Sequence, residues 1–412
     1  MTYLAGGEQR AVYVFVVTPT NELHFPDDFL WGTATAAHQI EGGNTNSDWW
    51  RFEHTDGSGC QDSSGDACDS WNRYEEDLDL VQQFGLNSFR FSVEWARVEP
   101  ARGEYSRAAL THYRAVINAC RERDIIPVVT LHHFTLPQWV ADAGGFESPE
   151  IVTWMAAYAA EVAAALGDVI GVACTINEPN IVALMGYLYG IFPPAQHGWD
   201  RFCAVNATMR ACHAAMRDAL KAGPGDYPVG LTLSMTQYEA VDGGESRLAS
   251  WIAEMEDSYL EAVRGDDFLG VQCYSKSLIG PHGPVHPTAD DDVTDMGYLF
   301  WPQCVEHTVR RAAKIAQVPL IVTENGIATA NDQRRIDYIF EALQGLHRTI
   351  EDGIDVRGYF QWSLLDNFEW VLGYSQRFGI VSVDRQTFAR TAKPSAHWFG
   401  DVARRSTLFL HS

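Results

Sequence analysis

Two glutamates lie at the ends of similar apolar runs. Glu178 directly follows the run 169–177, and Glu324 directly follows 319–323. Both runs are rich in β-branched and small residues, which is typical of strands buried on both faces of a parallel sheet. If that sheet closes into a barrel, all strand C-termini meet at one face, and the two carboxyl groups share a pocket. Paired carboxylates in a pocket are the groups that cleave glycosidic bonds, so this reaction is predicted.

A single glutamate at a strand end is more often a solvated loop residue or the anion at a helix N-terminus. Here the same arrangement of residues occurs around both glutamates. Each glutamate has an asparagine as its neighbour, and proline or glycine follows within two positions. We therefore favour the catalytic interpretation.

The elements that would position these glutamates form one continuous alternation of strands and helices, with no linker. Eight parallel strands with crossover helices indicate an α/β fold, a single-domain (β/α)8 TIM barrel over residues 23–412. We interpret residues 1–22 as an N-terminal extension. A doubly wound open sheet is the competing topology, but its usual glycine-rich phosphate loop is missing after the first strand. The predicted strands are 29–37, 88–93, 125–133, 169–177, 229–235, 268–274, 319–324 and 356–364, and the predicted helices are 71–84, 108–123, 149–166, 203–221, 247–264, 306–316 and 334–351.

Polar or aromatic side chains follow most of these strands. One polar or aromatic residue at a strand end means little, but such residues at seven of eight strand ends predict a pocket that they line. Consecutive strand residues point to opposite faces, so we expect the adjacent histidines not to share a metal ion. Glu94 is interpreted as a solvated rim carboxylate, with a substrate contact as the alternative. The strand-end residues are Gln39, Arg90, His132, His133, Asn177, Glu178, Tyr274, Glu324 and Trp362.

The composition limits the partners and the compartment. With 54 acidic and 30 basic residues, the net charge of −24 argues against nucleic acid or an anionic membrane as a partner. The early apolar run 11–17 is too short to span a bilayer. Eight scattered cysteines favour free thiols in a reducing cytoplasm, although Cys60 and Cys68 share a polar loop and a disulfide between them stays open.

The chain resembles glycoside hydrolase family 1, the retaining β-glucosidases, from about residue 25 to 399. Taken together the matching motifs are specific, whereas Asn-Glu-Pro alone would indicate only the wider clan of barrel glycosidases. The motifs are Phe29-Leu30-Trp31-Gly32-Thr33-Ala34, Gln39-Ile40-Glu41-Gly42, Phe89-Arg90-Phe91-Ser92, Thr175-Ile176-Asn177-Glu178-Pro179, Thr323-Glu324-Asn325-Gly326 and 362–370, which reads WSLLDNFEW.

The resemblance implies a role for each matching residue. Glu178 would be the general acid/base and Glu324 the nucleophile, with Arg90 and Tyr274 beside it. Trp362 would be the platform beneath the sugar ring. The side chains that would hold the sugar hydroxyls are Gln39, His133, Asn177, Glu369 and Trp370.

These roles agree with the chemistry of a retaining enzyme, which needs two carboxyl groups about 5–5.5 Å apart with different pKa values. Arg90 would keep Glu324 ionised, while Glu178 needs a raised pKa to carry a proton. The mechanism requires no metal and no organic cofactor. Glu369 would accept hydrogen bonds from a free sugar but repel a phosphate, which favours non-phosphorylated substrates.

Three positions depart from the family pattern. Phe134 and Ala173 stand where tryptophan is common, so indole bulk and N–H donors are missing there. Gln272 stands where asparagine is usual, and it can form the same amide hydrogen bonds with a longer reach. We expect Gln272 to support catalysis with altered positioning.

The sequence thus predicts a cytoplasmic retaining β-glucosidase that hydrolyses terminal non-reducing β-D-glucosyl residues of small β-glucosides or cello-oligosaccharides. One alternative is a family member that prefers β-galactosides or β-fucosides, or that transfers the sugar to an acceptor other than water. A more remote alternative is a catalytically silent sugar-binding barrel, which would be expected to lack one carboxylate. The oligomeric state stays open.

Overall fold

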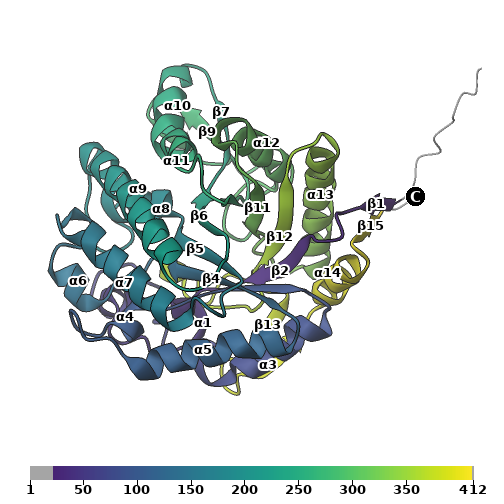
Figure 1. Ribbon diagram of the computed structural model, residues 1–412. Coiled ribbons are helices and arrows are strands. Elements are labelled where there is room, and N and C mark those ends of the chain that lie inside the picture. The colour runs from purple at the N-terminus through teal and green to yellow at the C-terminus, as the bar shows by residue number, and fades with distance from the viewer. Residues whose placement is uncertain (1–21, 411–412) are drawn as a thin grey trace, which may run out of the picture.

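Eight parallel strands close into a barrel within residues 22–410, the part of the chain that the computed structural model describes. Figure 1 shows these strands at the centre with helices around them. The predicted fold class is therefore confirmed. In order around the barrel the strands are β11 (Leu320–Asn325), β12 (Val356–Trp362), β2 (Leu30–Ala34), β3 (Ser88–Ser92), β4 (Ile126–His132), β5 (Val172–Asn177), β6 (Val229–Ser234) and β8 (Phe268–Gln272).

The strands that carry the two glutamates have every residue buried, as expected for strands covered on both faces. Only β6 and β8 separate β5 from β11 around the barrel. Residues far apart in the sequence therefore reach the same side of the barrel mouth.

The helices cover the outside of the barrel, and each predicted helix is present with small shifts of its ends (Figure 1). The predicted helix 247–264 is a composite of two α-helices joined by a π-helical turn. The covering helices are α3 (Ser70–Gln83), α5 (Arg107–Glu122), α7 (Ile151–Leu166), α9 (Trp199–Ala222), α10 (Glu245–Ile252), η3 (Ala253–Asp257), α11 (Ser258–Ala262), α12 (Cys304–Ala316), α13 (Asp332–Glu351) and α14 (Pro394–Arg405).

Short elements in the loops were not predicted. Those that build the barrel mouth are α1 (Ala37–Ile40), α2 (Asp48–Glu53), α4 (Trp95–Val98), α6 (Gln138–Asp142), η1 (Gly145–Glu147), α8 (Pro179–Ala183), η2 (Leu184–Leu188) and η4 (Trp370–Leu372). The small sheets are β7 (Gln237–Ala240) with β9 (Lys276–Gly280) and β10 (Gly283–Val285), and β13 (Val381–Val383) with β14 (Arg390–Ala392).

The first and last described strands form a small sheet of their own. Strand β1 (Glu22–His24) pairs antiparallel with β15 (Thr407–Phe409), close to the C-terminus in Figure 1. The predicted extension 1–22 lies outside the described residues except for Glu22, and the domain boundaries at 23 and 412 stay predictions. No helix among residues 22–410 is both long and apolar enough to cross a membrane.

One glycine shows how closely the strand ends are packed around the glutamates. A Cβ atom on Gly326 would lie 2.1 Å from the backbone oxygen of Trp362. Glycine at this position lets the chain leaving β11 pass directly beside the end of β12. The segment after Glu324 and the backbone of Trp362 are thereby held next to each other.

Candidate active site

A pocket of about 410 Å³ lies at the C-terminal ends of the barrel strands. Both glutamates line it, although they are far apart in the sequence. The size is typical of a small-molecule site. The predicted residues that line it are Gln39, His133, Asn177, Glu178, Tyr274, Glu324, Trp362, Glu369 and Trp370.

The carboxylate of Glu324 is held on both sides by donors. Arg90 on β3 donates from Nη1 to Oε1 over 2.6 Å, and the Tyr274 hydroxyl donates to Oε2 over 2.6 Å. Burial raises the pKa of Glu324, while Arg90 and Tyr274 oppose that rise by favouring the ionised form. The ionised carboxylate is therefore stabilised by one cation and one hydroxyl donor.

Glu178 has a different environment. It follows β5 in a left-handed conformation, with φ of 44°. It occupies the N-cap position of α8, but its side chain forms no capping hydrogen bond. No ion pair joins it to a cationic side chain in residues 22–410, and its Oε1 is buried without a hydrogen-bond partner there. Burial and then the negative charge of Glu324 raise the pKa of Glu178 well above its usual range. The surroundings of Glu178 thus favour its protonated form, whereas Arg90 and Tyr274 favour the ionised form of Glu324.

Asn177 directly precedes Glu178 in the chain, and its side chain binds Arg90, the same arginine that holds Glu324. Its Oδ1 accepts hydrogen bonds from Arg90 Nη2 at 2.5 Å and from Gln272 Nε2 at 2.9 Å. The side chain of Gln272 also lowers the pKa of Glu324. The longer amide at position 272 therefore reaches both the asparagine and the carboxylate.

The orientation of Asn177 also sets the tautomer of His133. Because Oδ1 faces Arg90, Nδ2 is the atom that donates to His133 Nε2 over 3.1 Å. Burial lowers the pKa of His133 well below its usual range, so the ring is neutral and carries its proton on Nδ1. That Nδ1, like Oε1 of Gln39, is buried without a partner among the described residues. A sugar hydroxyl would satisfy both atoms.

Glu369 and the rings of Trp362 and Trp370 complete the inner end of the pocket. Gln39 Nε2 donates to Glu369 Oε2 at 3.5 Å, and burial raises the pKa of Glu369 to about 8, with a further contribution from the charge of Glu324. Rings of Trp362 and Trp370 both stack on His133, with centroids 6.0 and 6.2 Å away. Phe134 packs against Trp370 at 4.9 Å. The imidazole therefore packs against two indole rings that are nearly parallel to it.

The arrangement can perform a displacement in two steps. One carboxylate, kept ionised by Arg90 and Tyr274, can attack, and a second carboxyl group of higher pKa can donate a proton. Neither step needs a third side chain to gain or lose a proton. Within residues 22–410 no group of three or more His, Cys, Asp or Glu side chains is arranged to hold a metal ion.

Comparison with known proteins identifies the family. The family model described as "Glycosyl hydrolase family 1" matches residues 21–266 and 285–408. The chain belongs to glycosyl hydrolase family 1.

Characterised and solved members of family 1 match this chain over most of its length. "Beta-glucosidase A" of Thermotoga maritima is 32% identical, covering 94% of this chain and 99% of the relative. The "Bifunctional beta-D-glucosidase/beta-D-fucosidase" of Bifidobacterium breve is 33% identical, covering 91% and 97%. Among solved structures, "beta-glycosidase BGL167" is 42% identical with a TM-score of 0.87, covering 92% of this chain and 97% of its own. This family 1 chain is therefore a glycoside hydrolase with the fold of a β-glycosidase.

Two sequence-based interpretations in this family 1 chain have clear structural outcomes. Glu94 is not a solvated rim carboxylate: it is buried, accepts from the backbone N–H of Ala96, and accepts from the Thr135 hydroxyl at 2.8 Å. That prediction was wrong because the loop after β4 folds over it. His132 packs beside Phe146 and does not line the pocket, in line with its predicted structural role.

The outer half of the pocket was missed in the sequence. It is lined by apolar side chains from the loops, mainly from the segment that follows Glu178. The apolar run 181–185 could have predicted part of this lining. Met296 lies in a polar loop, and nothing in the sequence around it indicates a position in the pocket. The apolar lining residues are Phe134, Ile181, Leu184, Met185, Ile191, Phe192, Met296, Val371, Leu372 and Phe378.

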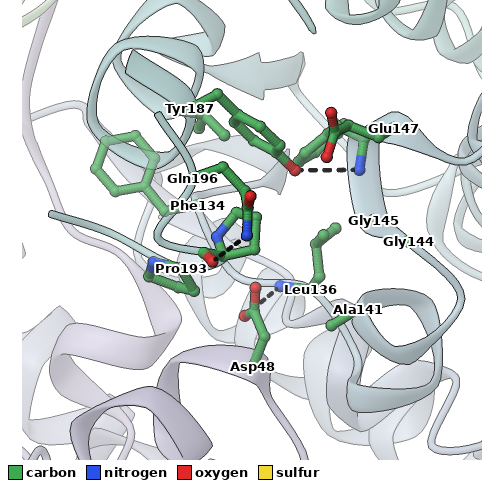
Figure 2. A pocket seen from close by; sticks show the side chains of 13 residues that line it. Asp48, Phe134, Leu136, Ala141, Gly144, Gly145, Glu147, Tyr187, Pro193 and Gln196 are labelled. Atoms are coloured by element: carbon green, nitrogen blue, oxygen red, sulfur yellow. Dashed lines mark hydrogen bonds between the residues drawn. The ribbon is translucent and has the colours of Figure 1, made fainter. Parts of the chain in front are cut away.

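A second cavity of about 190 Å³ lies behind Phe134, whose side chain lines both spaces. Figure 2 shows the carboxylate of Asp48 directed into it, where Oδ1 accepts from the backbone N–H of Leu136 at 2.8 Å. Burial raises the pKa of Asp48 to about 7. This buried carboxyl group is outside the catalytic set, and it had no sequence signal.

The cysteines are free thiols throughout the described chain, including half-buried Cys60 and buried Cys68.

Proposed function

We propose that this family 1 chain is a retaining β-glucosidase that removes terminal non-reducing β-D-glucosyl residues from small β-glucosides or cello-oligosaccharides. The observation that supports it most directly is the unequal environment of two carboxyl groups in one pocket. Arg90 and Tyr274 hold Glu324, whereas Glu178 has no ion pair among the described residues and has the higher pKa. Both beta-glucosidase relatives named above are consistent with this proposal.

In the first step Glu324 Oε attacks the anomeric carbon while Glu178 gives its proton to the departing oxygen. The bond from the anomeric carbon to that oxygen breaks, and an ester to Glu324 forms. Esterification removes the negative charge of Glu324, which was one cause of the raised pKa of Glu178. Glu178 therefore becomes ionised and can take a proton from water, which attacks the anomeric carbon in the second step and breaks the bond from that carbon to Glu324.

The glycone is held by the buried polar atoms that have no protein partner. Gln39 Oε1 and His133 Nδ1 would bind sugar hydroxyls, with Glu369 beside them as a further acceptor or donor. Trp362 would lie under the apolar face of the ring. None of these groups offers a positive charge for a phosphate, which supports free rather than phosphorylated glucosides.

The two glutamates can be tested with substrates of different leaving-group quality. Glu178→Gln should lower kcat/KM for methyl β-D-glucoside by about 100- to 10,000-fold. It should lower it much less for 2,4-dinitrophenyl β-D-glucoside, whose leaving group needs little protonation. Glu324→Gln should abolish turnover of both substrates, since neither can form the ester. Glu122→Gln, an exposed substitution on α5, is the matched control.

Near-wild-type turnover in either active-site variant would reject the assignment. Azide provides a second check, because it should restore Glu324→Ala with inversion and Glu178→Ala with retention. A panel of nitrophenyl glucosides, galactosides and fucosides would establish the glycone, and the fucosidase activity named for the Bifidobacterium relative makes the fucoside essential. Added alcohol acceptors would reveal transglycosylation.

The free thiols support a reducing compartment, and we propose that the enzyme works in the cytoplasm.

A further inference from the structure

The catalytic pocket has two chemically distinct halves. Its polar side chains gather around the two glutamates and are buried or nearly so, with Gln39, His133 and Asn177 each at most 5% exposed. The side chains farther out are partly exposed and almost entirely apolar. They are Ile181, Met185, Ile191, Met296, Tyr298, Val371 and Leu372.

Solvent exposure of large apolar side chains concentrates at this mouth. Ile191 is 41% exposed and Tyr298 is 43% exposed, and both line the pocket. Tyr189 is two residues from Ile191, and Val293 is bridged to Leu299 beside Tyr298; both are also exposed. Of the seven exposed large hydrophobic side chains in residues 22–410, two therefore line the pocket and two more lie close to them along the chain or across a β-bridge. Apolar groups that gather at a concave opening mark a binding surface.

From this lining we infer that the leaving group of the natural substrate is apolar, an aryl or alkyl group, and that a second sugar is a poor leaving group. The inference rests on the proposed function, since it concerns the other side of the bond that the two glutamates cleave. It narrows the substrates from β-glucosides in general to hydrophobic β-glucosides.

The physical reason is the cost of removing hydroxyl groups from water. A glucosyl leaving group has several hydroxyls, but among the pocket-lining side chains that are at least partly exposed, three carry a hydroxyl to bond them, those of Ser234, Tyr274 and Tyr298. Hydroxyls left without partners lose binding energy, whereas each methylene placed against Ile191 or Met296 gains it. The same surface thus favours one class of leaving group and penalises the other.

The experiment compares kcat/KM for methyl, butyl, hexyl and octyl β-D-glucoside with that for cellobiose. Alkyl glucosides have similar intrinsic leaving groups, so differences among them report binding of the chain. We expect kcat/KM to rise about two- to fourfold per methylene up to hexyl, and hexyl glucoside to exceed cellobiose at least tenfold.

The double variant Ile191→Gln/Met296→Gln should flatten the alkyl series and narrow the gap to cellobiose. Ile126→Gln is the matched control, because Ile126 is similarly exposed, at 38%, but begins β4 at the opposite end of the barrel. That control should retain the wild-type slope.

The possible outcomes separate the two proposals. A flat alkyl series in the wild type, or cellobiose as the better substrate, would overturn the inference and leave the β-glucosidase assignment intact. An unchanged slope in the double variant would show that these residues do not form the leaving-group surface. Failure to hydrolyse any of the five glucosides would overturn the proposed function, and this inference with it.

Discussion

Replacing Tyr274 with phenylalanine is predicted to weaken catalysis while leaving the barrel folded. The hydroxyl donates to Glu324 Oε2 over 2.6 Å, opposite the bond from Arg90 to Oε1. Burial, together with the negative charge of Glu324, raises the pKa of Tyr274 well above its usual range. Tyr274 therefore remains a proton donor at every pH at which the enzyme would work.

The magnitude follows from the charge on the acceptor. A hydrogen bond to a charged group is worth about 1.5–3 kcal/mol. If that energy is used to position the carboxylate for attack, its loss lowers kcat/KM about 10- to 150-fold. The hydroxyl also lowers the pKa of Glu324, so its removal raises that pKa. The acidic limb of the pH profile should consequently move to higher pH, because the nucleophile is protonated more readily.

The assay is kcat/KM for methyl β-D-glucoside over the full pH range, with circular dichroism to verify folding. Tyr189→Phe is the matched control, since Tyr189 lies two residues from the pocket-lining Ile191 and its hydroxyl forms no hydrogen bond within residues 22–410. A Tyr274→Phe enzyme with wild-type kcat/KM and an unmoved acidic limb would refute the role given to this hydroxyl. So would an equal loss in Tyr189→Phe.

Two further predictions concern buried positions. The pKa of Asp48 is raised to about 7, so this carboxyl stabilises the fold least when ionised: stability should fall as pH rises from about 4 to 7, by up to about 4 kcal/mol. Asp48→Asn should reduce the loss of stability between pH 5 and pH 8 in urea unfolding without removing it, because Glu41 and Glu256 also have pKa values raised to about 7. An unchanged pH dependence would contradict the prediction. Gly326→Ala should displace Trp362, whose oxygen lies 2.1 Å from the added carbon, and lower kcat/KM about 100-fold. Gly345→Ala, whose added carbon meets a side-chain atom at 3.1 Å, should retain activity, and equal effects of the two substitutions would count against the argument.

The barrel was predictable because its strands are short runs of β-branched and small residues that differ clearly from the helices between them. The runs that end at Asn177 and Glu324 are buried along their whole length, as their composition indicates. The composite helix 245–262 shows the limit of this approach, since a π-helical turn leaves the hydrophobic pattern nearly unchanged. Loop elements such as α8 and η4 had no periodic signal.

Glu94 shows most clearly why the site could not be completed in the same way. Its position after a strand suggested solvent, and only the loop carrying Thr135 buries it. Asp48 is likewise buried by residues distant in the chain, and this burial raises its pKa, whereas the hydrogen bond from the backbone N–H of Leu136 lowers it. Burial of a polar side chain depends on what packs over it, and that information is not local.

The sequence alone determined the order of strands and helices, and it placed Glu178 and Glu324 at strand ends, because backbone preferences and hydrophobic periodicity are local properties. Only the tertiary structure decided how deeply each glutamate is buried and how the pocket is divided into polar and apolar halves. Those properties arise from the burial and charge that separate segments impose on one another, as Arg90 on β3 and Tyr274 after β8 do on Glu324.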